Sequence, residues 1–238
     1  MQRRNTISAK EAKERVAKKR AERLAAMKQA EKKETEDVNL YRSAEEQSDS
    51  IDTELDQIKQ KSIADGSFMK APNGKRTNLN ERQWLQVRTK AFKEWFGDWE
   101  NDPKNASKVV NENGEPLPVW HITNEDFTKF ETSKARQNAD IPAFYFATNK
   151  EDWKDMGKRA MSVFLNLRNP VEKPDANMQG STVKERLLEK GVDGTYVIED
   201  GQVAEYAAFF PNQIKSAADN VGTFDNENED IRFRINRQ

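Results

Sequence analysis

The sequence QVAEYAAFFPNQIK, residues 202–215, has the apolar character of a buried β-strand, with one residue that does not fit. Alternate residues of a strand point to opposite faces of a sheet, and both faces of the segment 203–210 are apolar except at Glu205. Burying an unpaired carboxylate costs several kcal/mol, as much as the largest effects of single substitutions. We therefore expect either an open strand end at Glu205 or a partner that holds its charge.

Further strand patterns flank this segment on both sides. Before it, we predict a hairpin around Asn113-Gly114 in KVVNENGEPLPVWHIT, a strand in AFYFAT and a strand in MSVFLNLRNP that stops at Asn169-Pro170. A helix in STVKERLLEKG is expected to stop at Gly191, and a hairpin to turn at Asp200-Gly201. The segment DIRFRI, with Ile231, Phe233 and Ile235 on one face, is expected to form a closing strand. Several hairpins with few intervening helices predict an α+β domain with mostly antiparallel strands and flanking helices. Neither a G-x-G-x-x-G nor a P-loop motif is present, so no Rossmann or P-loop nucleotide site is indicated.

An aromatic-rich helix is expected to open this domain. In TNLNERQWLQVRTKAFKEWFGDWE, Asn80 and Gln83 have the spacing of a helix cap, and Gly97 follows the last apolar position. The apolar residues between them form a broad helical stripe, which is most simply explained by core packing. We therefore predict one helix from Asn80 to Gly97.

The first part of the chain is far more polar. Residues 1–33 contain twelve Lys or Arg and four Glu, and residues 34–56 contain nine Asp or Glu and one Arg, whereas all five Trp and all twelve Phe lie from Phe68 onward. Ser8 and Glu11 have the spacing of a capping box, so a long helix is expected to start near Ser8. We divide the chain into a charged helical extension (1–60), a linker (61–80) and a folded domain (81–238).

Composition excludes several classes of function. The chain has no cysteine and a single histidine, so a disulfide framework, a thiolate metal site and a histidine-rich metal site are all ruled out, and no metal is expected. It has no run of about 18 apolar residues and no apolar stretch typical of a signal peptide. We expect a soluble cytoplasmic protein with no membrane partner.

Three residues stand out at strand ends among apolar neighbours: His121 in VWHIT, Tyr145 in FYFAT and Glu205 in AEYAAFF. Each alone has an ordinary explanation as a core or exposed residue. In this order, the three motifs resemble the ADP-ribosyltransferase family, in the His-Tyr-Glu branch that includes diphtheria-type toxins and poly(ADP-ribose) polymerases. Over about residues 84–235, from FKEWFGDWENDPKNASKVVNENGEPLPVWHIT through FLNLRNP and GVDGTYV to FFPNQIKSAADNVGTFDNENEDIRF, the sequence is similar to ADP-ribosyltransferase domains of phage and mobile-element polyvalent proteins.

The resemblance implies an ADP-ribosyltransferase-like core that uses NAD⁺ as its substrate. Such enzymes break the bond between nicotinamide and ribose through an oxocarbenium-like transition state. Glu205 would stabilise the developing positive charge and orient the ribose, His121 would hydrogen-bond a ribose hydroxyl, and Tyr145 would stack on the nicotinamide ring. Thr123 is expected on the pocket wall. Trp153 is the nearest candidate for a second aromatic beside the nicotinamide, with a core or surface role as the alternative.

Two positions depart from the family pattern. The residue after the histidine is usually glycine, whose backbone holds the nicotinamide carboxamide, and Ile122 occupies that position. Its backbone can still contact the cofactor, but a β-branched side chain adds bulk and does not readily adopt a positive φ, which puts activity in doubt. Val203 replaces the Glu or Gln that arginine-modifying relatives have two residues before the catalytic glutamate, which disfavours arginine as the acceptor.

These observations predict an NAD-dependent mono-ADP-ribosyltransferase that modifies a host protein or nucleic acid and releases nicotinamide. We expect it in the cytoplasm of a bacterial host or carried in a phage virion, with the charged extension as a tether or as a binding segment for a virion component or an acidic partner. One alternative, motivated by Ile122, is a catalytically inactive phage structural or cargo protein, or an NAD-binding module, with the same fold. Another is a nucleic-acid-binding protein that acts through residues 3–33, whose binding would weaken strongly with salt.

Overall fold

The computed structural model divides into two compact units, residues 1–49 and 50–238. It describes residues 18–19, 22, 25–26, 28–29, 32–33, 50–135, 141–174, 181–220, 222, 224–225 and 227–232. The described residues of the first unit are helical and exposed, and the helix start expected near Ser8 lies outside them. Among the described residues, no helix combines the length and the apolar character needed to cross a bilayer.

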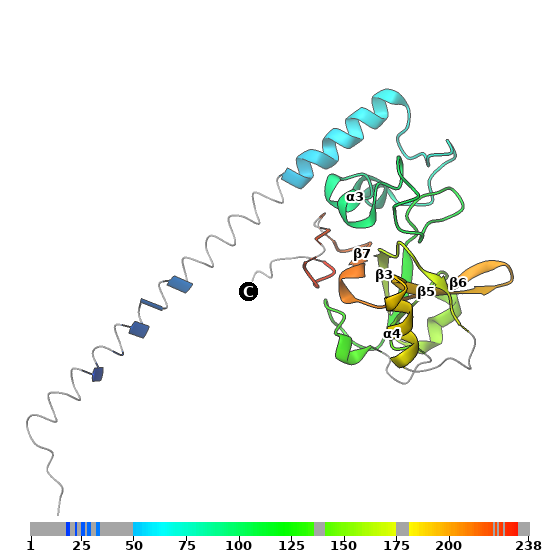
Figure 1. The fold of residues 1–238 in the computed structure, drawn as a ribbon. Coiled ribbons are helices and arrows are strands. Elements are labelled where there is room, and N and C mark those ends of the chain that lie inside the picture. The colour runs from blue at the N-terminus through cyan, green and yellow to red at the C-terminus, as the bar shows by residue number, and fades with distance from the viewer. Residues whose placement is uncertain are drawn as a thin grey trace, which may run out of the picture. The chain divides into compact units, whose positions relative to one another are not determined.

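The second unit is built on a seven-stranded sheet with the order β4-β5-β6-β2-β1-β3-β7 (Figure 1). The strands are β1 (Val119–Thr123), β2 (Phe144–Ala147), β3 (Arg159–Leu165), β4 (Val171–Glu172), β5 (Gly194–Glu199), β6 (Gln202–Ala208) and β7 (Ile214–Ser216). All neighbouring strands are antiparallel except β4 and β5, which are parallel. This arrangement confirms the predicted α+β class with mostly antiparallel strands.

Helices and short 3-10 turns flank the sheet. Residues 50–65 are helical, and they are followed by α2 (Glu81–Gln86), α3 (Lys90–Phe96), η1 (Thr132–Lys134), η2 (Lys150–Met156), α4 (Ser181–Glu189) and η3 (Pro211–Gln213). The predicted cap at Asn80 and Gln83 is confirmed as a reciprocal capping box. Gly97 ends α3 with a φ of 101°, as the sequence indicated.

The single helix predicted between Asn80 and Gly97 is wrong in one respect, because the chain breaks into α2 and α3. The Thr89 hydroxyl donates to the carbonyl of Gln86 at 2.8 Å and accepts the amide of Phe92 at 3.2 Å. A threonine that caps a new helix competes with continuation of the old one. After the break, α3 packs its aromatic residues into the core.

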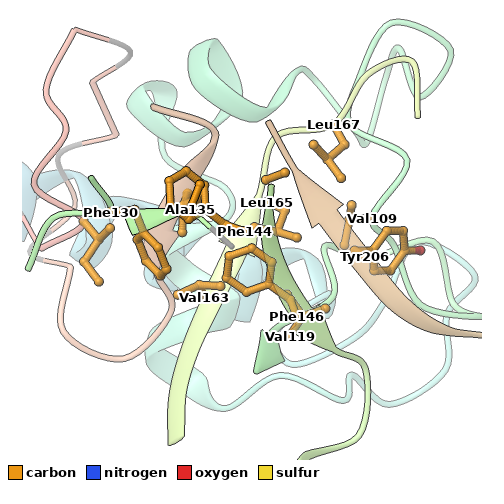
Figure 2. Close-up of a cluster of buried hydrophobic side chains, with 13 residues drawn as sticks. Val109, Val119, Phe130, Ala135, Phe144, Phe146, Val163, Leu165, Leu167 and Tyr206 are labelled. Atoms are coloured by element: carbon orange, nitrogen blue, oxygen red, sulfur yellow. The ribbon is translucent and has the colours of Figure 1, made fainter. Parts of the chain in front are cut away.

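Three clusters of buried apolar side chains hold the unit together. The first joins Phe146 and Tyr206 of the β2–β6 half of the sheet to Val163 and Leu165 of β3 (Figure 2). These side chains share one face of the sheet, so the cluster covers that face from β6 to β3. A second cluster packs α2 and α3 against Phe164, and a third contains Val183 of α4. The predicted core role of the aromatic stripe is confirmed.

The remaining sequence predictions are confirmed in part. The hairpin at Asp200-Gly201 joins β5 to β6, and Gly191 with a φ of 73° follows α4, both as expected. The hairpin around Asn113-Gly114 is reduced to a turn with one isolated bridge, from Val110 to Pro116, and β3 ends at Leu165, before Asn169. Of the closing strand, Asp230 forms one bridge with Lys129, while Phe233 and Ile235 lie outside the described residues.

The compact unit begins earlier in the chain than the domain boundary expected at residue 81. Ile51 and Leu79 are buried, and the ring of Phe68 packs edge-on against Trp84 with centroids 5.4 Å apart. The segment expected to end the extension and form a linker therefore packs on the domain. Its few apolar residues are separated by charged ones, so composition alone did not mark them as core.

Removal of residues 1–49 is expected to leave the thermal unfolding temperature of the second unit unchanged. Removal of residues 1–80 is expected to lower it, because Ile51, Phe68 and Leu79 are lost and burial of each such side chain contributes about 1.5–3 kcal/mol. Circular dichroism melts of the two truncated chains, beside the full chain, measure the difference. Equal stability of both truncations would contradict the boundary at residue 50.

Candidate active site

Three neighbouring strands carry the residues that the sequence singled out. His121 is on β1, Tyr145 on β2 and Glu205 on β6, and the sheet order β6-β2-β1 makes these strands adjacent. Ala147 of β2 pairs with Trp120 on one side and with Glu205 on the other. The fold thus brings together three residues that are up to 84 positions apart in the sequence.

The two faces of the sheet separate these residues into two groups. Glu205 pairs with Ala147, and Tyr145 lies two residues before Ala147, so Tyr145 and Glu205 are diagonal neighbours on one face. The His121 side chain lies on the opposite face, where its ring contacts three phenylalanines. Its ring centroid is 6.1, 5.1 and 5.5 Å from those of Phe127, Phe130 and Phe146.

A cavity of about 320 Å³ lies at the end of β1 and the beginning of β2. Five of the six predicted site residues line it, namely His121, Ile122, Thr123, Tyr145 and Trp153. Glu205 is not among the lining residues and adjoins the cavity on the sheet, diagonal to Tyr145. Phe130 and Met156 also border the cavity, and neither was predicted as a site residue. The aromatic pair in DFTKF was the available signal for Phe130.

His121 is held in one tautomer by a backbone carbonyl. Its Nδ1 lies 3.0 Å from the carbonyl oxygen of Tyr145. A carbonyl can only accept, so Nδ1 carries the proton and Nε2 of the neutral ring is an acceptor. Burial lowers the pKa of His121, and the bond to the Tyr145 carbonyl opposes that effect only partly. The site therefore presents a hydrogen-bond acceptor suited to a hydroxyl group.

A nuclear magnetic resonance titration of His121 checks this directly, because it is the only histidine of the chain. We expect nitrogen shifts of the Nδ1-protonated tautomer and a pKa below the unfolded value of about 6.5. Since the unfolded state then binds more protons at acid pH, the contribution of His121 to stability is complete above about pH 6.5 and is lost as the pH falls. A pKa above 6.5, or the Nε2-protonated tautomer, would contradict this assignment.

Tyr145 borders the cavity, and its hydroxyl is hydrogen-bonded elsewhere. The hydroxyl donates to the carbonyl of Ile141, and the residue packs in the cluster with Ala207 and Phe209. Trp153 packs against the same cluster from η2. The ring of Tyr145 is therefore anchored, which favours a stacking role over proton transfer.

Ile122 fits into β1 without backbone strain. The non-glycine residues with positive φ among the described residues are Met69 and Asp200, so Ile122 does not need the conformation that glycine favours. Its side chain borders the cavity and reduces the space there. The isoleucine in place of the usual glycine therefore adds side-chain volume at the cavity but no backbone strain.

Gly157 holds η2 against the end of β1. A Cβ atom at this position would lie 2.6 Å from both the carbonyl carbon and the carbonyl oxygen of Thr123, although the φ of Gly157 is that of extended backbone. The close approach sets the position of η2, which brings Trp153 and Met156 to the cavity wall. No local sequence pattern predicts this close approach of Gly157 to β1.

Gly157→Ala is expected to push η2 away from β1, to weaken NAD⁺ binding, and to cost about 1–3 kcal/mol of unfolding free energy through overpacking. Gly74→Ala is the control for NAD⁺ binding alone, because a Cβ there meets nothing within 4 Å, whereas its positive φ is expected to lower stability by about 1–2 kcal/mol. Chemical denaturation and NAD⁺ titration measure both effects. Unaltered NAD⁺ binding in Gly157→Ala would show that η2 does not form the cavity wall.

The mostly antiparallel sheet carries a histidine, a tyrosine and a glutamate on three adjacent strands, as expected of an ADP-ribosyltransferase-like domain. Residues 111–224 match the family described as ADP-ribosyltransferase in polyvalent proteins. This segment contains all seven strands and all six predicted site residues, and its match confirms the resemblance seen in the sequence. No curated protein matches the chain. Among the described residues, no group of three or more His, Asp or Glu side chains could ligate a metal ion.

Proposed function

We propose that the domain is an NAD⁺-dependent mono-ADP-ribosyltransferase that transfers ADP-ribose to a host macromolecule and releases nicotinamide. The observation that carries this proposal is the cavity bordered by His121 and Tyr145 and adjoined on the same sheet by Glu205, in a segment of the ADP-ribosyltransferase family. The charged N-terminal segment serves as a tether or as a binding segment for a virion component or an acidic partner. The protein acts in the cytoplasm of a bacterial host.

The nicotinamide end of NAD⁺ enters the cavity beside β2. At about 320 Å³, the cavity is at the lower end of the range of small-molecule sites, which suits one end of a dinucleotide better than the whole molecule. The ring of Tyr145 and the indole of Trp153 offer flat faces to a cationic pyridinium. The backbone of Ile122 supplies the amide and carbonyl groups for the carboxamide.

The proposed binding mode places the two riboses of NAD⁺ on opposite faces of the sheet. Tyr145 and Glu205 share a face, so a nicotinamide stacked on Tyr145 directs its own ribose towards Glu205. His121 lies on the other face, and its Nε2 accepts a hydroxyl of the ribose on the adenosine side. NAD⁺ therefore bends around the end of β1.

The reaction needs one carboxylate and no proton donor for the leaving group. The bond between ribose C1′ and the pyridinium nitrogen breaks, and its electron pair leaves with neutral nicotinamide. Positive charge develops on the ribose, and the Glu205 carboxylate stabilises it. A nucleophile of the acceptor then bonds to C1′ and gives up its proton, which yields the ADP-ribosylated product.

Nicotinamide release from NAD⁺ labelled in the nicotinamide ring tests this function, with and without host protein and RNA. The full chain is expected to release the label, and Tyr145→Leu is expected to release it more slowly because a stacking face is lost. Tyr196→Leu, which replaces a partly buried tyrosine on β5, is the matched control. Unchanged release in Tyr145→Leu would contradict the stacking role.

The alternative of an inactive domain rests on one observation, the bulk of Ile122 at the cavity. In that case the full chain binds NAD⁺ without releasing nicotinamide. Ile122→Gly is then expected to restore release, since the backbone at this position is unstrained and only the side chain obstructs. If neither the full chain nor Ile122→Gly releases nicotinamide or binds NAD⁺, both the transferase and the NAD-binding function are ruled out.

A further inference from the structure

The strand β6 contains one residue more than its partner β5 where the two strands pair, directly before Glu205. Val197 of β5 pairs with Glu205, whereas the next residue of β5, Ile198, pairs with Val203. The pairing skips Ala204, so Ala204 is the additional residue of a β-bulge. Bulges are common beside active sites, where they change the direction of a side chain.

The bulge places Val203 and Glu205 on opposite faces of the sheet. In a regular strand, residues two positions apart share a face. The partners of Val203 and Glu205 on β5 are consecutive residues, which point to opposite faces, so the two β6 residues do the same. Accordingly, Val203 packs against the first apolar cluster, which contains Tyr206, whereas Glu205 lies on the face of Tyr145. The bulge therefore lets β6 contribute to the core on both sides of a carboxylate that points away from it.

Thr148, the residue that follows β2, holds the bulge from the other side of β6. Its hydroxyl donates to the carbonyl of Val203 at 2.8 Å and lies 3.2 Å from the carbonyl oxygen of Ala204. Its backbone amide donates to the carbonyl of Ala204 at 3.0 Å. A bulge interrupts the regular hydrogen bonds between strands, and the hydroxyl adds a donor there that the backbone alone does not supply. Thr148 therefore fixes which residue of β6 is the additional one.

The position of the bulge decides the direction of the Glu205 carboxylate. If the bulge moved by one residue along β6, Ala204 would pair with Val197, and Glu205 would become the residue without a partner on β5. Its carboxylate would then be displaced relative to Tyr145. A displacement of about 1 Å between reacting groups can lower a rate by about a hundredfold. A side chain that keeps the bulge in place therefore affects the rate of the proposed reaction.

We infer that Thr148 is a positioning residue for the proposed reaction, because its hydroxyl fixes the bulge at Ala204 and thereby directs the Glu205 carboxylate towards the ribose. The inference rests on the proposed ADP-ribosyltransferase function and adds a residue to its machinery. Thr148 does not line the cavity that contains His121 and Tyr145. It acts through Glu205, so its hydroxyl contributes to the rate of nicotinamide release and not to the affinity for NAD⁺.

Steady-state kinetics of nicotinamide release from NAD⁺ test the inference with the full chain. Thr148→Val keeps the shape of the side chain and removes the hydroxyl, whereas Thr148→Ser keeps the hydroxyl and removes the methyl group. Thr148→Ala also lacks the hydroxyl and replaces Thr148→Val if that variant does not fold. Thr53→Val, at an exposed position of the helix 50–65 away from the cavity, is the matched control. Circular dichroism melts define a temperature at which every variant is folded, and the rates are measured there.

We expect Thr148→Val to lower kcat by about tenfold to a hundredfold at an unchanged KM for NAD⁺, because the cavity keeps its shape while the Glu205 carboxylate is displaced. Thr148→Ser and Thr53→Val are expected to keep the kcat of the full chain. An unchanged kcat in Thr148→Val, an effect on KM alone, or an equal loss in Thr148→Ser overturns the inference while the proposed function stands. Absence of nicotinamide release from the full chain overturns both.

Discussion

Glu205→Gln is expected to lower nicotinamide release by about 10²–10³-fold while the protein still binds NAD⁺. The amide has almost the shape of the carboxylate, so the strand pairing of residue 205 with Ala147 is preserved. Under the proposed function, the substitution removes the negative charge that would stabilise the positive charge developing on the ribose. The proposed binding mode attributes NAD⁺ affinity mainly to the stacking and hydroxyl contacts of the cavity, so NAD⁺ binding is expected to change little.

Glu199→Gln provides the matched control for this substitution. Glu199 is an exposed carboxylate on β5, next to the hairpin that leads into β6. Its replacement is expected to leave both nicotinamide release and NAD⁺ binding unchanged. Rapid release by Glu205→Gln, at the rate of the control, would show that another group stabilises the ribose.

Phe92→Ala is expected to lower the free energy of unfolding of the second unit by about 3–5 kcal/mol, the usual cost of removing a fully buried phenylalanine. The side chain has no exposed surface. Its ring packs on four aromatic rings from α3, β3 and the C-terminal segment. The centroid distances are 5.7 Å to Trp95, 5.0 Å to Phe96, 5.2 Å to Phe164 and 4.8 Å to Phe224.

Chemical denaturation of Phe92→Ala and Ile63→Ala measures this effect against a surface control. Ile63 is 52% exposed, so its truncation is expected to change stability by less than about 0.5 kcal/mol. A loss below about 1 kcal/mol in Phe92→Ala would mean that α3 is not an integral part of the domain. The family match begins only at residue 111, so this variant also tests whether the folded unit extends beyond it.

Local sequence signals predicted most of the elements because each one depends on neighbouring residues. The Asn80 cap, the positive φ of Gly97 and Gly191, and the turn at Asp200-Gly201 all follow from the chemistry of single residues. The break between α2 and α3 was missed, since the apolar stripe continues through Thr89 and only its capping bonds reveal the interruption. The early start of the compact unit was missed for the opposite reason, because few apolar residues mark it.

The site was predictable as a set of residues but not as a geometry. His121, Tyr145 and Glu205 stand out in the sequence, yet only the register of β1, β2 and β6 shows that Tyr145 and Glu205 share a face and that His121 lies on the other. Gly157 acts through a long-range backbone contact that no local pattern encodes.

Titration of NAD⁺ into the Glu205→Gln protein, observed at the ring nitrogens of its single histidine, is the decisive measurement. The variant is expected to consume NAD⁺ slowly, and His121 is the only histidine of the chain and so the only source of such signals. We predict a saturable change in the Nε2 shift as a ribose hydroxyl donates to it, with Nδ1 still bonded to the Tyr145 carbonyl. An Nε2 signal that stays unchanged while the folded protein is exposed to millimolar NAD⁺ would mean that this cavity is not the NAD⁺ site.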